Sequence, residues 1–204
     1  MIVTNIEAVT KTKYKVYIDE KFAFVLYKGE LSRYRIAVGQ ELKSEIYIKI
    51  RSEIVVKRAK LRALHLLNAM GRTEAQLHQK LAQDHYTEDI IDEAIDYVKS
   101  FGYIDDENYA RNFIDSRKDK KSKKEIFAQL LQKGISKEVL ERAFEECYES
   151  NSARDAIMAI MQKRQYNPET ADRKETQKIM GYLMRKGFGY EDIRQVIQVY
   201  EWDA

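Results

Sequence analysis

The fold is decided by residues 122–144, which read SKKEIFAQLLQKGISKEVLERAF. A related segment precedes them at 73–95, and another follows at 175–197. The three segments share five apolar positions: Leu77, Leu81, Tyr86, Ile91 and Ile95; Ile126, Leu130, Ile135, Leu140 and Phe144; Ile179, Leu183, Phe188, Ile193 and Ile197. A repeat of this length is a supersecondary unit that must stack on its neighbours to bury its hydrophobic face. We therefore expect tandem helical repeats, an architecture that usually binds a large partner.

The middle helices of the first two repeats have recognisable start signals. Thr73 with Gln76, and Ser122 with Glu125, have the spacing of a capping box. In this motif the hydroxyl accepts a hydrogen bond from an unpaired amide, and the Gln or Glu side chain reaches back to the cap residue. We expect a helix to begin directly after Thr73 and after Ser122.

The ends of the middle helices are also marked. Gly134 and Gly187 can take the left-handed conformation that closes a helix, and His85 occupies this position in the first repeat. The next helix then begins at Ser136 or near Tyr190, so consecutive helices must turn sharply. This turn resembles helix-turn-helix geometry, but helix pairs of any α-solenoid use it too, so it is weak evidence for DNA reading.

The amino-terminal residues have a different pattern. Apolar alternation over 14–18 and 22–26, interrupted at 19–21, predicts a β-hairpin, and residues 2–9 are expected to form a third strand. The stretch 44–70 contains no Gly or Pro and has helical apolar spacing, which leaves a break near Ser52 open.

Together these patterns predict a mainly α protein. Its three tandem three-helix repeats are expected in an elongated arrangement, preceded by a small β-rich N-terminal unit. The expected boundaries are 1–56 for the β-rich unit and 57–102, 103–150 and 151–204 for the three repeats.

Composition allows a globular core and says little about partners. The chain has 204 residues, 44% of them hydrophobic, and a formal net charge of +3, so local charge must carry any argument for nucleic acid. It has no run of 18 apolar residues, and no hydrophobic signal segment follows Met1, so we expect a cytosolic protein with no membrane partner. Cys147 aligns with Val98 and Tyr200, which predicts a buried apolar residue rather than a nucleophile.

Catalytic and metal-binding motifs are nearly lacking in the sequence. There is no Gly-rich phosphate loop, and the three histidines do not have metal-ligand spacing. In the repeat register His78 aligns with Phe127 and Met180, which predicts a half-buried packing residue. Asp105 and Asp106 could hold a metal, but adjacent acids at a helix start more often complement the helix dipole. We expect neither an enzyme nor a cofactor.

One charge cluster stands out before the middle helix of the second repeat. Its members are Arg117, Lys118, Lys120, Lys121, Lys123 and Lys124, with Arg111 upstream. Most such runs are solvated loops. Here the cluster precedes a helix whose first amides already favour anions, so we expect it to bind either phosphate groups or an acidic protein surface.

Several short motifs resemble those of a known family. They are residues 102–106 (GYIDD), 109–113 (YARNF) and 130–135 (LLQKGI), with 72–81 in the first repeat and 185–193 in the third. In this order and spacing they resemble the RecX family of regulators of the RecA recombinase. One departure concerns 121–123, where the family often has a glycine and this chain has Lys-Ser-Lys, which makes the loop stiffer and more cationic.

The resemblance implies a monomeric, non-enzymatic modulator of RecA. Such a protein would lie in the groove of the RecA filament on DNA, mostly inhibit its activity, and so regulate DNA repair, homologous recombination and the SOS response. Residues 1–56 would thicken the contact, bind DNA or cap the first repeat. Two alternatives are a sequence-tolerant DNA-binding protein that uses its helix-turn-helix-like units directly, and a helical-repeat adaptor for another protein.

Overall fold

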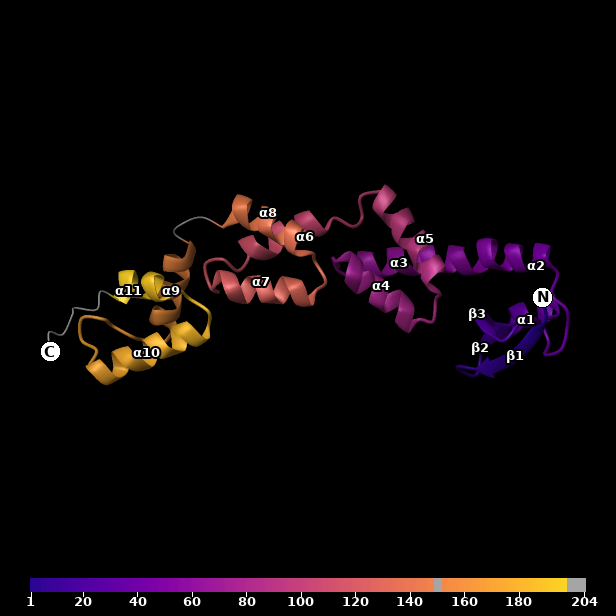
Figure 1. Ribbon diagram of the computed structural model, residues 1–204, viewed down its shortest axis with the longest axis horizontal. Coiled ribbons are helices and arrows are strands. Elements are labelled where there is room, and N and C mark those ends of the chain that lie inside the picture. The colour runs from indigo at the N-terminus through magenta and orange to yellow at the C-terminus, as the bar shows by residue number, and fades with distance from the viewer. Residues whose placement is uncertain (149–151, 198–204) are drawn as a thin grey trace. The chain divides into compact units, whose positions relative to one another are not determined.

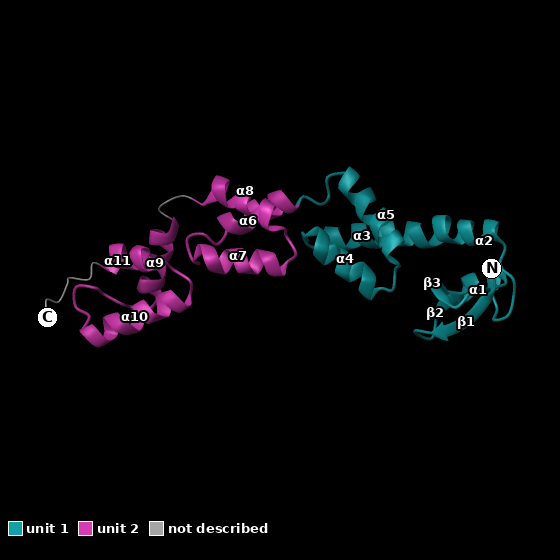
Figure 2. Ribbon diagram, in the orientation of Figure 1, with its two compact units in different colours: residues 1–105 teal, residues 106–204 magenta. Residues whose placement is uncertain are grey.

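The computed structural model describes residues 1–148 and 152–197, and the chain divides into two compact units. The first unit is Met1–Asp105 and the second is Asp106–Ala204 (Figure 2). Among the described residues, no helix has the length and apolar character needed to cross a membrane.

A three-stranded antiparallel sheet opens the first unit, as the apolar alternation predicts (Figure 1). Its strands are β1 (Val3–Ala8), β2 (Lys13–Ile18) and β3 (Lys21–Tyr27), paired in chain order. Asp19 and Glu20 both have positive φ, 48° and 65°, which matches the twist of a tight hairpin turn. Alternate side chains of β2 and β3, among them Val16 and Phe24, are buried.

One helical stretch joins the sheet to the repeats. Short helix α1 (Lys28–Tyr34) follows β3; then α2 (Ser44–Lys49), the π-helical segment η1 (Ile50–Val56) and α3 (Lys57–Ala69) continue without interruption. The helix does not break at Ser52. It widens into π geometry there, and the Ser52 hydroxyl donates to the Ile48 carbonyl at 2.8 Å. Such π segments are usually single-turn bulges within an α-helix.

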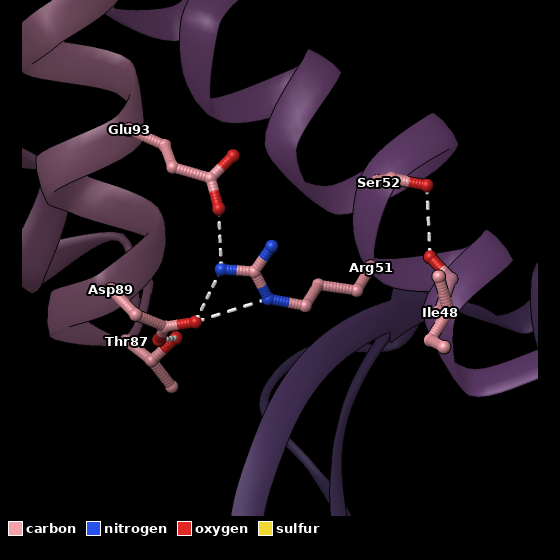
Figure 3. A network of polar contacts seen from close by, with 6 residues as sticks. All are labelled: Ile48, Arg51, Ser52, Thr87, Asp89 and Glu93. Carbon is pink, nitrogen blue, oxygen red and sulfur yellow. Dashed lines mark hydrogen bonds and ion pairs between the residues drawn. The ribbon is translucent and has the colours of Figure 1, made fainter. Parts of the chain in front are cut away.

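Arg51 anchors η1 to the first repeat (Figure 3). Its guanidinium Nε donates to Asp89 at 3.0 Å, and its Nη2 also pairs with Glu93. Burial tends to raise the pKa of Asp89, but hydrogen bonds from Thr87 and Arg51 outweigh it, so this pKa lies below its ordinary value. The buried side chains of the sheet and of the first repeat belong to one hydrophobic cluster. The division at residues 56 and 57 thus falls inside a continuous helix, and the four-part boundaries stay a prediction.

Each repeat consists of three helices. The first contains α3, α4 (Glu74–Gln83) and α5 (Glu88–Ser100). The second contains α6 (Asp106–Asp115), α7 (Lys123–Gln132) and α8 (Lys137–Cys147). The third contains α9 (Ser152–Lys163), α10 (Arg173–Arg185) and α11 (Tyr190–Ile197). The described residues are mostly helical, so the predicted fold class is confirmed.

The predicted apolar register matches the observed core. Of the fifteen aligned positions, fourteen are buried. Tyr86 is half-buried and packs against the cluster that contains the first repeat. Burial raises the pKa of Tyr86 to about 12. The second and third repeats each form a separate cluster, centred on residues such as Leu130 and Leu183.

The predicted helix starts are correct, with one difference in detail. Thr73 and Gln76 form both hydrogen bonds of a capping box. Ser122 caps α7 by accepting from the Glu125 amide, but the Glu125 carboxylate accepts from Lys121 at 2.9 Å rather than completing the box. Lys121 competes for this carboxylate because it lies four residues before it.

The predicted helix ends are also correct. Gly134 and Gly187 have φ of 84° and 89°, and His85 takes the same left-handed conformation with φ of 64°. His78 is half-buried, as expected, with Nε2 2.7 Å from Glu88. The prediction that Cys147 is buried is wrong, because Cys147 is only half-buried. Its partial burial still raises the pKa of the thiol.

Candidate functional site

Two of the seven predicted cations brace the second repeat internally. Arg111 on α6 pairs with Glu146 on α8 at 3.1 Å. The Lys118 amine lies 3.0 Å from Asp115 and donates to the Cys147 carbonyl at 3.1 Å. Both side chains therefore hold the start and the end of the repeat together.

Two further cations lie over aromatic rings. The Arg117 guanidinium carbon is 3.7 Å from the ring centre of Phe113, and the Lys123 amine is 5.4 Å from that of Phe144. Cation–π contacts of this kind orient a charged group without neutralising it. Arg117 and Lys123 are thus oriented by aromatic rings of their own repeat.

The remaining three cations flank the junction between the second and third repeats. Lys124 is exposed in the first turn of α7, and its Cβ lies close to Gly187 in the third repeat. Lys120 and Lys121, in the loop before α7, line a cavity of about 720 Å³. The seven predicted residues therefore differ in their surroundings, and Lys120, Lys121 and Lys124 lie next to residues of the third repeat.

The cavity is lined by both apolar and cationic side chains. The apolar part of the lining consists of Ala159 and Ile160 of α9 and Tyr182 of α10. Five cations and one carboxylate line the rest: Lys120, Lys121, Lys163, Arg164, Lys186 and Glu125. The cavity volume lies within the range of about 300–1,000 Å³ that is usual for ligand pockets.

Most of the positive charge around this cavity is uncompensated. Lys121 pairs with Glu125. Within 1–148 and 152–197, no carboxylate oxygen lies within 4.0 Å of the side-chain nitrogens of the other four cations. The Arg164 guanidinium carbon lies 3.6 Å from the ring centre of Tyr182. The interaction with this guanidinium lowers the pKa of Tyr182.

The wall beside the cavity is fixed by contacts between the two repeats. The Ser122 hydroxyl, on a residue only 2% exposed, donates to the Lys186 carbonyl at 2.6 Å. A Cβ placed on Gly187 would lie 3.0 Å from the Ser122 hydroxyl and 3.1 Å from Lys124 Cβ. The end of α10 thus fits closely against the start of α7, and the cavity lies alongside this contact.

Sequence reasoning missed the contribution of the third repeat. Lys163 and Arg164 are adjacent, but they lie far along the chain from Lys186 and from the charge run at 117–124. The signal that could have found them is their position at the ends of α9 and α10, because helix ends of neighbouring units meet at a junction.

The arrangement is suited to binding anions. Among the residues that the structure describes, no group of three His, Cys, Asp or Glu side chains is placed to hold a metal ion. Asp106 begins α6, and Asp105 directly precedes this helix. The cavity can bind a ligand electrostatically, since charged hydrogen-bond donors line it beside apolar side chains.

Comparison with known proteins agrees with the repeat structure. The first, second and third three-helix domains of RecX match residues 59–97, 105–143 and 153–197, respectively. A protein named regulatory protein RecX from Caldanaerobacter subterraneus subsp. tengcongensis is 32% identical over 201 residues, which cover 98% of this chain and all of that protein. A protein of the same name from Clostridium botulinum (strain Eklund 17B) is 27% identical and aligns over 92% of this chain and 90% of its own length.

Solved structures support the same fold. A crystal structure of regulatory protein RecX aligns with a TM-score of 0.62 at 23% identity, covering 98% of this chain and 99% of that one. RecX from Lactobacillus salivarius aligns with a TM-score of 0.59 at 26% identity, covering 70% and 94%. With three matching domains and a full-length relative above 30% identity, the chain belongs to the RecX family of regulatory proteins.

Proposed function

We propose that this protein binds the RecA filament on DNA, in its groove, and mostly inhibits RecA's recombinase activity, thereby regulating DNA repair and recombination. The observation that carries the proposal is the match of all three repeats, in order, to the domains of a family of regulatory proteins. The full-length relative named regulatory protein RecX supports it. The protein then acts by binding, as a monomer in the cytosol, without a reaction or cofactor of its own.

The repeat structure suits a regulator that contacts a polymer. The second and third repeats each have a hydrophobic cluster of their own. The exposed side chains of each repeat lie outside this cluster and are available for contacts with a partner. Surface side chains of successive repeats can then meet successive subunits or phosphates. Among the predicted cations, Lys120, Lys123 and Lys124 are exposed and suit such contacts, whereas Arg111 and Lys118 are held by partners on their own repeat.

Sedimentation with preassembled RecA filaments tests the proposal. The protein should sediment with filaments and remain in the supernatant with the same DNA lacking RecA at the same salt. Filament ATP hydrolysis and strand exchange should fall as the protein is added. Equal sedimentation with and without RecA, or unchanged RecA activity at saturation, contradicts the proposal.

Direct DNA binding is the second candidate, and the uncompensated cations around the cavity favour it. Contacts with phosphates release counterions, so the affinity for naked DNA would fall steeply with salt. A log-log salt plot for duplex and single-stranded DNA without RecA distinguishes the candidates. A steep slope with saturable binding supports a DNA-binding protein.

A further inference from the structure

The cavity between the second and third repeats has a composition that the filament-binding proposal does not require. A surface that only attracts a polyanion needs cations, and it needs no apolar side chains in a hollow. Here the side chains of Ile160 and Tyr182 line the same hollow as Lys120, Lys163 and Arg164. Such a combination fits a ligand that carries a flat apolar part and several negative charges.

The number of unpaired cations around the cavity indicates how many negative charges a matching ligand would carry. Four cations lack a carboxylate partner among the described side chains, and the single carboxylate, Glu125, is paired with Lys121. A monoanion would leave most of this charge uncompensated. A group with three or four negative charges would balance it, and Lys and Arg side chains are the usual partners of phosphate oxygens.

The position of Arg164 further restricts the chemical class of the ligand. Its guanidinium lies over Tyr182, with 3.6 Å between the guanidinium carbon and the ring centre. This stacking orients a planar set of N–H donors in the lining of the cavity, and such a set suits the oxygens of a phosphate. The exposed side of the guanidinium and the Ile160 side chain offer the apolar and planar contacts that a nucleobase uses.

We propose that this cavity binds a nucleoside polyphosphate, with the phosphates on the lysines and on the edge of the Arg164 guanidinium, and the base against Ile160 and the exposed face of that guanidinium. The two walls belong to different repeats, because Lys120 precedes α7 and Lys163 ends α9. Bound nucleotide therefore links the second repeat to the third. The proposal does not rest on RecA binding, and its test contains no RecA.

The test is isothermal titration calorimetry of the full-length protein with magnesium-free ATP, tripolyphosphate and adenosine. ATP should bind most tightly, tripolyphosphate more weakly because it lacks the base, and adenosine only marginally because it lacks charge. The test variant combines K163Q, R164Q and K186Q. The matched control combines K137Q, R173Q and K174Q, which removes the same charge from exposed side chains of the second and third repeats that do not line the cavity.

The cavity variant should bind ATP at least about tenfold more weakly, since each charged hydrogen bond that is removed contributes about this factor or more. The control should change the affinity by less than about twofold, as expected of screened surface charges. Equal losses in both variants would mean a diffuse electrostatic attraction and would overturn the proposal. So would the lack of saturable ATP binding by the folded wild-type protein. Binding of an oligonucleotide alone, with sensitivity to the cavity variant, would assign the cavity to a nucleic-acid strand and also overturn the proposal.

Discussion

The Ser122 hydroxyl donates a 2.6 Å hydrogen bond to the carbonyl oxygen of Lys186, 64 residues further along the chain. The same hydroxyl accepts from the Glu125 amide at 3.1 Å. One buried side chain therefore caps a helix of the second repeat and joins it to the end of a helix in the third. The two repeats are linked by a polar contact as well as by chain connectivity.

Replacement of Ser122 by Ala should destabilise the protein more than replacement of Ser136. Both serines cap a helix, a role whose loss costs about 1 kcal/mol. Only Ser122 is buried and bonded to another repeat, so S122A should cost about 0.5–1.5 kcal/mol more. Urea unfolding of both variants measures the difference. Equal losses would show that the Lys186 contact contributes nothing to stability.

Replacement of His85 by Gly should stabilise the first repeat. His85 has φ of 64°, a conformation that costs a residue with a Cβ about 1 kcal/mol or more and that glycine takes without steric strain. We expect a net gain of about 0.5–1 kcal/mol, because glycine's greater freedom in the unfolded chain offsets part of the relief. H85A is the control, since it removes the imidazole but keeps the Cβ. Stabilisation by H85A to the same extent would place the effect in the imidazole instead.

The repeat architecture could be predicted because its signals are local. Apolar residues at helical spacing identify the buried face, and caps such as Thr73 and Ser122 depend only on the next three residues. The left-handed conformation of His85 followed from its alignment with Gly134 and Gly187. These features need no knowledge of how one repeat packs on the next.

The site could be predicted only in part because it depends on packing between segments far apart in sequence. The charge run suggested one cationic surface, but Arg111 and Lys118 find partners on α8, which the run itself does not reveal. Lys163 and Arg164 reach the same cavity as Lys120 only after the second and third repeats have packed together. The π-helical geometry of η1 likewise has no signal in the apolar pattern.

Truncation of the aligned core leucines tests the repeat register. Leu81, Leu130 and Leu183 are each fully buried, so replacing any one by Ala should cost about 2–5 kcal/mol through the reduced transfer energy and the cavity left behind. L131A is the control because Leu131, next to Leu130, is 37% exposed. Guanidinium unfolding measures all four variants. Near-neutral results for the three core positions would contradict the register.

Replacement of Asp89 by Asn should weaken the protein at neutral pH and have little effect in acid. The folded-state pKa of Asp89 lies below its ordinary value, so its contribution is complete above the unfolded pKa of about 3.9 and is lost as pH falls through the folded pKa. Because the side chain is 59% exposed, the loss at pH 7 should not exceed about 1 kcal/mol.

Unfolding curves of D89N and wild type at a series of pH values measure this effect. Asp92, an exposed residue of the same helix, supplies the control D92N. The difference between D89N and wild type should shrink in acid, while D92N stays near wild type throughout. A constant difference at all pH values would mean that the charge of Asp89 is not what stabilises the contact with Arg51.

Neutralising the exposed cations should weaken filament binding without unfolding the protein. The variant K120Q, K123Q and K124Q removes exposed charges, whereas R111Q with K118Q removes cations that brace the second repeat. The first should reduce binding to RecA filaments while the unfolding midpoint stays near wild type. The second should lower the midpoint, since it breaks the contacts that α6 and the turn after it make with α8. Filament sedimentation and urea unfolding of both variants separate a binding role from a structural one.

The salt dependence of the binding affinity then identifies which groups the exposed cations bind. If they bind phosphates, the log-log salt slope should fall by roughly 0.9 for each phosphate that is no longer neutralised, in filament and DNA binding alike. If they meet acidic groups on RecA, filament affinity and above all the association rate should fall, while binding to DNA alone stays unchanged. A variant with all six cations of the run, Arg117 to Lys124, replaced by Gln covers the rest of the cluster. Wild-type filament binding and RecA inhibition by that folded variant would mean that the run is a solvated loop, and the contact surface would then lie on other helical faces or on the amino-terminal sheet.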